Sequence, residues 1–107
     1  MNECCGHCDQ AVIAVADRQN WRISVFCIGG EFLRHVGAGD LGYVNSIACS
    51  AFGELVASDD GNDRVVLFGV DGKLSRTMDL YICKSVAIHG GAVYAQSSGC
   101  GVCVVFT

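Results

Sequence analysis

Cysteine and histidine are the residues of this sequence whose types and spacing come closest to a metal site. Two C-x-x-C pairs lie near opposite ends of the 107-residue chain, and thiolates with a neighbouring histidine are ligands that zinc takes. The candidate ligands are Cys4, Cys5, His7, Cys8, Cys100 and Cys103. We favour a cysteine-rich tail plus small buried side chains instead, because strand geometry separates a pair that flanks the start of a strand. No metal or other cofactor is expected, and Cys27, Cys49 and Cys83 are expected to fill the core.

Serine, histidine and aspartate are also present in the combination that nucleophilic catalysis uses. Ser50, His89 and Asp59 are the residues that could be assembled into such a triad. However, no serine lies in a nucleophile-elbow sequence, and the histidines fall in predicted turns or at strand ends. The sequence therefore predicts a protein that is not an enzyme.

Composition and charge narrow the class of protein further. Hydrophobic residues make up 51% of the chain and charged residues 17%, which suits one small globular domain and excludes a disordered segment. The net charge of −4 gives no general attraction to nucleic-acid phosphates or anionic lipids, so RNA is a less favoured partner than protein. With no signal-peptide pattern and no membrane-spanning apolar run, a soluble, cytoplasmic protein with reduced thiols is expected.

An internal repeat organises the elements that must position these residues. Residues 11–37 superpose on residues 53–79 at an offset of 42 without a gap. The identical signature residues of the two copies are Asp17, Asn20, Arg22, Phe26 and Gly30 in the first and Asp59, Asn62, Arg64, Phe68 and Gly72 in the second. A third, weaker copy matches 85–87 to 46–48 and lacks the Asp, Asn and Arg. A period of this length indicates tandem structural units.

Each unit is predicted to be a sheet of short antiparallel strands, because its apolar runs are rich in valine and isoleucine and are separated by Gly, Asn or Asp. The four strands of the middle copy, a to d, are predicted at 46–49, 55–58, 64–68 and 74–78. Asp71-Gly72 and Gly29-Gly30 can supply the positive φ angles of two-residue hairpin turns. The run 65–68 is apolar on both faces, so we expect each four-stranded meander to be stacked against others, as in the blades of a β-propeller.

The repeated residues resemble an NHL repeat. Segments 16–37 and 58–74 share the core Asp-x-x-Asn-x-Arg-(Ile/Val)-x-(Val/Leu)-Phe, and the resemblance covers nearly everything after Gln10. It departs from the family pattern at Trp21, where the family often has histidine. The resemblance implies an all-β open arc of four-stranded antiparallel blades, a partial β-propeller of the NHL type. A cysteine-rich tail at 1–10 would precede blade 1 at 11–43 (strands b–d), blade 2 at 44–80 (strands a–d) and a degenerate blade 3 at 81–107 (strands a–c).

The polar signature residues are expected to have a structural role. Each aspartate closes strand b, where it can accept backbone N–H groups of the following turn, and each asparagine suits a left-handed conformation. Each arginine opens strand c within reach of that aspartate, so the two charges can satisfy each other where neighbouring blades exclude water.

About ten strands are too few for a closed propeller, which takes roughly four to eight four-stranded blades. The favoured explanation is a partial chain from a longer protein. Self-association of several copies through open blade edges, which would complete a ring, is the second.

The connections b–c and d–a meet at one end of an antiparallel stack and form the candidate binding surface. Its residues are Arg18, Gln19, Trp21, Asp40, Tyr43, Asp60 and Asp63. An exposed tryptophan beside an arginine is typical of interface anchors, although Trp21 packed onto its own turn is the alternative. The three aspartates make the surface acidic, which favours a protein partner over RNA.

The resemblance to the NHL region of tripartite-motif proteins implies a function as well as a fold. In those proteins the propeller binds RNA or protein through such a face, so we expect a non-catalytic protein–protein interaction scaffold. A ubiquitin-ligase context follows only by analogy with those proteins. Two alternatives stay open at this stage: a fragment of an NHL-like propeller enzyme, such as a metal-dependent lyase or hydrolase, and an RNA-binding NHL module.

Overall fold

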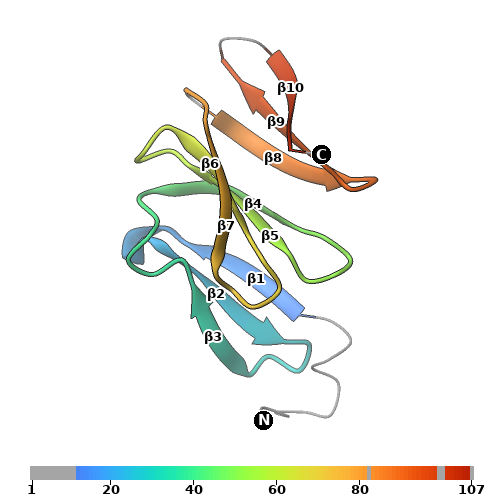
Figure 1. The fold of residues 1–107 in the computed structure, drawn as a ribbon. Helices are drawn as coiled ribbons and strands as arrows, with labels where there is room; N and C mark the ends of the chain where they lie inside the picture. Colours follow the sequence, from blue (N-terminus) through green and yellow to red (C-terminus); the bar gives the residue numbers. More distant parts are fainter. Residues whose placement is uncertain (1–11, 82, 99–100, 107) are drawn as a thin grey trace.

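The computed structural model describes residues 12–81, 83–98 and 101–106 (Figure 1). This part of the chain contains ten β-strands, a three-residue turn of 3-10 helix and no α-helix. Within it, no helix has the length and apolar character that crossing a membrane requires. The elements are β1 (Val12–Asp17), η1 (Arg18–Asn20), β2 (Arg22–Cys27), β3 (Phe32–Val36), β4 (Val44–Cys49), β5 (Leu55–Asp59), β6 (Arg64–Phe68), β7 (Leu74–Asp79), β8 (Cys83–His89), β9 (Ala92–Ser97) and β10 (Gly101–Phe106).

The strands form three antiparallel meanders that follow one another along the chain. They are an N-terminal sheet (β1-β2-β3), a middle sheet (β4-β5-β6-β7) and a C-terminal sheet (β8-β9-β10). The middle sheet lies between the other two, and β4 contacts β1 on one side and β8 on the other (Figure 1). The prediction of an all-β fold made of antiparallel meanders is confirmed. The four strands predicted for the middle copy correspond to β4 to β7, with ends that agree within two residues.

Two apolar layers hold the three sheets together, one on each side of the middle sheet. Consecutive residues of β5 and β6 are fully buried, because alternate side chains enter opposite layers. The first layer contains Ile23, Val25, Val36, Leu41, Val44, Leu55, Ala57, Val66 and Phe68. The second contains Val56, Val65, Leu67, Cys83, Val86, Val93, Ala95 and Phe106. Each large apolar side chain buried in this way stabilises the fold by roughly 1.5–3 kcal/mol.

The turns between predicted strands c and d, which are β2 and β3 in the N-terminal sheet and β6 and β7 in the middle sheet, are one residue longer than predicted. The Gly72 N–H donates to the Gly69 carbonyl at 2.9 Å, and the Gly69 N–H donates to the Lys73 carbonyl at 2.9 Å, which encloses three residues. Gly72 has a φ of 80° and Gly30 has a φ of 93°, as a left-handed turn residue requires. The extra residue is accommodated by a β-bulge beside each turn, where the strand register shifts.

Two of the three cysteines expected in the core are there. Cys27 and Cys83 are buried, and the Cys83 thiol lies 3.6 Å from the Ser85 carbonyl oxygen. The same prediction was wrong for Cys49, which is exposed because it is the last residue of β4, beside the surface turn at 50–54.

Candidate functional site

Asp59 is the buried centre from which the loop end of the middle sheet is built. It closes β5, and its fully buried carboxylate accepts a hydrogen bond from Arg64 Nε at 2.9 Å and one from Asn62 Nδ2 at 2.9 Å. Its other oxygen accepts the Gly42 backbone N–H at 3.0 Å. Because Gly42 belongs to the connection from the N-terminal sheet, this carboxylate joins that connection to the turn between β5 and β6. The arginine supplies the opposite charge that a buried carboxylate needs.

The N-terminal sheet carries the same cluster in a more exposed position. Arg22 Nε lies 3.1 Å from the Asp17 carboxylate, and Asn20 Nδ2 donates to Asp17 at 3.0 Å. The hydrogen bonds from Asn20 and Arg22 hold the pKa of Asp17 below its ordinary value of 3.8. The Asp17 side chain is nevertheless 28% exposed, whereas that of Asp59 is 0% exposed. The two copies of one signature thus differ in how well they are covered.

Two expectations for the signature residues were wrong. The left-handed residues are Trp21 and Asp63, with φ angles of 57° and 52°, and not the two asparagines that precede them. Each asparagine uses its side-chain amide to bind the aspartate, which leaves the next residue to reverse the chain. For the same reason the aspartates do not accept backbone N–H groups of the following turn, and Asp59 accepts one from the preceding connection instead. The expected Asp–Arg pairing is present in both copies.

The seven residues predicted as a binding surface are exposed and lie at one end of the stacked sheets; we call them the loop face. Arg18 lies against Tyr43, with its guanidinium carbon 5.7 Å from the ring centre, and Nη1 donates to the hydroxyl at 3.4 Å. Arg18 Nη2 also donates to the Asn45 carbonyl at 3.1 Å. The Tyr43 carbonyl accepts the Asp60 N–H at 2.8 Å. These contacts join the turn of the N-terminal sheet, the connection and the turn of the middle sheet into one surface.

The remaining residues of the loop face lie beside these contacts. Gln19 is exposed in η1, beside Arg18. Arg64 Nη2 donates to the Asp40 carbonyl, which holds the connection over β6. The Asp63 carbonyl accepts the Leu80 N–H at 3.0 Å, so the next connection along the chain reaches the same end.

Glycine at position 61 allows the closest approach within the loop face. A Cβ atom at Gly61 would lie 2.6 Å from the Tyr43 backbone nitrogen, which is too close for any side chain. The repeat places Gln19 at the equivalent position of the N-terminal sheet, where the side chain is exposed. Glycine is therefore needed where a connection packs onto the turn.

Three exposed aromatic side chains lie at the loop face or beside it. Trp21 is 60% exposed, so its indole is not buried on its own turn. Tyr43 is exposed in the first connection, and Tyr81 is exposed in the second, next to Leu80. Sequence reasoning missed Tyr81. Its position in the connection between β7 and β8, which is a d–a connection like the one that contains Tyr43, could have identified it.

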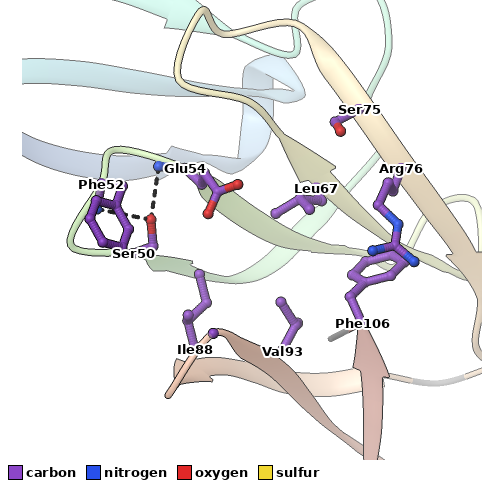
Figure 2. Close-up of a pocket in the computed structure, with 10 residues that line it drawn as sticks. Ser50, Phe52, Glu54, Leu67, Ser75, Arg76, Ile88, Val93 and Phe106 are labelled. Carbon is purple, nitrogen blue, oxygen red and sulfur yellow. Dashed lines mark hydrogen bonds between the residues drawn. The ribbon is translucent and has the colours of Figure 1, made fainter.

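A cleft between the middle and C-terminal sheets lies at the opposite end from the loop face. Its volume is about 250 Å³, and its lining includes the apolar side chains of Leu67, Val93 and Phe106. Figure 2 shows the Arg76 side chain against the Phe106 ring, with 4.6 Å between the guanidinium carbon and the ring centre. Sequence reasoning missed this cleft because its residues come from several strands and share no motif. The cleft is also lined by Glu54.

The structure also bears on the candidate catalytic triad and on the candidate metal ligands. Ser50 Oγ accepts the N–H groups of Phe52 and Glu54, whereas Asp59 lies at the far end of β5, so these two members of the candidate triad are separated by a strand. The candidate metal ligands other than Cys103 lie outside the described residues, as does the Cys103 side chain. Among the described residues, no group of three His, Cys, Asp or Glu side chains is arranged to hold a metal ion.

Comparisons with known proteins bear on the fold. No protein-family model matches the chain, and no curated protein matches its sequence. Among solved structures, the chain is similar to hydrazine synthase of Kuenenia stuttgartiensis, with a TM-score of 0.76 and 11% sequence identity. The match covers 90% of this chain and 29% of that chain. At such low identity the similarity concerns the arrangement of the strands alone, since one fold serves many functions.

Proposed function

We propose that this chain is part of a β-propeller of the NHL type and that it is a non-catalytic module that binds protein through its loop face. Three observations support the architecture: the repeated Asp-x-x-Asn-x-Arg core, the stacking of antiparallel meanders, and the Asp–Arg ion pair at the same place in both signature copies. Stacked four-stranded sheets with a period near 40 residues are typical of propeller blades.

The exposure of Trp21 is the observation that carries the proposed binding function. A left-handed backbone costs a residue with a Cβ roughly 1–2 kcal/mol, and here the residue is a tryptophan that is 60% exposed. Asp63 has the same conformation at the equivalent position of the middle sheet, so what distinguishes Trp21 is that this turn presents a large apolar side chain to solvent. Arg18 and Tyr43 lie in contact beside the same turn, and Trp, Tyr and Arg are the residue types most enriched among interface anchors.

The charges of the loop face favour a protein as its partner. Asp40, Asp60 and Asp63 are exposed around the aromatic residues, and Arg18 is engaged with Tyr43 and with a backbone carbonyl. Such a surface repels a phosphate backbone and suits a partner that presents basic and apolar side chains together.

Affinity capture with matched variants tests this function. The wild type, Trp21→Asn and Phe52→Asn are immobilised in equal amounts. Phe52→Asn is the control, because Phe52 is an exposed aromatic residue at the opposite end of the sheets. Asparagine tolerates the left-handed conformation, so Trp21→Asn removes the indole without opposing the turn. We expect proteins retained by the wild type and by Phe52→Asn to be lost with Trp21→Asn, before and after nuclease treatment. Equal retention by all three, or loss of binding after nuclease treatment alone, would contradict the proposal.

A further inference from the structure

The outward face of the N-terminal sheet is mostly apolar, although Ser24 and His35 also lie on it, and no described residue covers it. Ile13 and Val15 of β1 point to this face and are 42% and 46% exposed. Their equivalents 42 residues later, Leu55 and Ala57 of β5, are 5% and 0% exposed, because they lie in the apolar layer against the N-terminal sheet. The N-terminal sheet therefore presents outward the kind of face that the middle sheet buries.

Two aromatic rings extend this uncovered face across the N-terminal sheet. Ile13 pairs with Phe26 in the ladder between β1 and β2, so both side chains lie on the same side. The Phe26 ring is in edge contact with Phe32 of β3, with 5.8 Å between ring centres. Phe26 is half-buried, whereas its repeat equivalent Phe68 is fully buried in the layer between the sheets.

The outward face of the C-terminal sheet shows the complementary pattern. In the middle sheet Ser58 pairs with Val65, and the corresponding pair in the C-terminal sheet is Gln96 with Val102. Val65 is 0% exposed in the layer against the C-terminal sheet, whereas Val102 is 70% exposed. This sheet therefore presents outward the other face that the middle sheet buries.

We propose that a second copy of this chain covers these two faces, with the N-terminal sheet of each copy packed on the C-terminal sheet of the other. The junctions inside the chain already pair these two kinds of face, so a second copy in head-to-tail order repeats an existing interface. Two copies bring six sheets together, which lies within the range of roughly four to eight blades that close a propeller ring. Head-to-tail contacts form a closed assembly when the rotation closes, and here two identical junctions relate the two copies.

The new interface predicts a definite mass in solution. The 107-residue chain has a mass of 11.3 kDa, so the pair has twice that mass. We expect light scattering after size exclusion, at micromolar concentration, to give the mass of two copies. A folded monomer would overturn the proposal, because it would mean that other residues of the chain cover the faces or that they stay open. An open-ended series of larger species would overturn it as well.

Three variants test which faces meet. Ile13→Asp and Val102→Asp place a charge on one outward face each, and Leu74→Asp is the control, an exposed apolar position of β7 in the middle sheet. We expect the first two to be monomers and the control to remain a pair. Circular dichroism of each variant checks that the β-structure is kept.

Mixing the two face variants distinguishes head-to-tail association from contact between identical faces. A mixture of Ile13→Asp and Val102→Asp contains one junction made of two unaltered faces, so we expect it to recover species with the mass of two copies. If Val102→Asp alone remained paired, or if the mixture of the two variants stayed monomeric, the head-to-tail arrangement would be wrong. The ring rests on the propeller architecture proposed above, whereas a monomeric result leaves the Trp21 capture experiment unaffected, so the two proposals fail separately.

Discussion

Replacing Asp59 by asparagine should destabilise the protein far more than the same change at Asp17. The Asp59 carboxylate is fully buried and accepts hydrogen bonds from Arg64, Asn62 and the Gly42 backbone. An asparagine amide keeps only one acceptor oxygen, so its NH₂ group would face either the Gly42 N–H or, in the other orientation, the donors of both Arg64 and Asn62. Removing one member of a buried ion pair costs about 3–5 kcal/mol, and partial exposure of Arg64 reduces this to about 2–4 kcal/mol.

Urea unfolding of both variants measures the difference. A domain of this size has a total stability of about 5–15 kcal/mol, so the loss expected for Asp59→Asn lowers the midpoint clearly. Asp17 makes the same two side-chain contacts but is partly exposed, so water can replace them and Asp17→Asn should cost less than half as much. Equal losses for the two variants would refute the reasoning, because they would mean that the sheets do not cover the two clusters differently.

Three further predictions concern other parts of the molecule. Gly61→Ala should lower the stability by about 1–3 kcal/mol, since the added Cβ meets backbone at 2.6 Å, whereas Gln19→Ala at the equivalent position should be neutral in the same urea titration. The hydrogen bond from Asn20 and the Arg22 charge lower the pKa of Asp17, so this carboxylate stabilises the fold above its ordinary pKa of 3.8, and that stabilisation is lost as the pH falls through the lower folded value. Urea midpoints of the wild type and Asp17→Asn should therefore differ at pH 7 and converge below pH 3.8, and a constant difference would contradict this. Although Cys49 is exposed at the end of β4, partial desolvation of its thiol raises the pKa, so its alkylation at neutral pH should be slower than that of a small-molecule thiol and should accelerate at higher pH than usual; alkylation at the ordinary rate would show that the thiol is not shielded.

Local pattern predicted the strands well because each depends on residues close together in the sequence. The Val- and Ile-rich runs and the intervening glycines identified the strands of the middle sheet within two residues. Burial of neighbouring residues such as Val65 and Val66 on opposite faces also followed from the unbroken apolar run. The Asp–Arg pairing was predictable because the two residues face each other across a tight turn.

Features that depend on contacts between sheets could not be predicted in this way. The sequence pattern does not contain the hydrogen bond from Gly42 to Asp59, which joins residues 17 positions apart. Asparagine was expected to be left-handed from its general preference, but its side chain binds the aspartate and Trp21 takes that conformation instead. The cleft beside Arg76 likewise arises from how two sheets stack.

The order in which the three sheets stack is the claim on which the loop face and the end faces both depend. Nuclear Overhauser contacts in solution test it most directly, one across each junction. The Phe68 ring lies 3.1 Å from the position of a Cβ at Gly37, and the Val86 N–H lies 3.3 Å from Ser46 Oγ. The stacking predicts cross-peaks between the Phe68 ring and the Gly37 α-protons, and between the Val86 amide and the Ser46 β-protons. Their absence from a well-dispersed spectrum of the folded protein would contradict it.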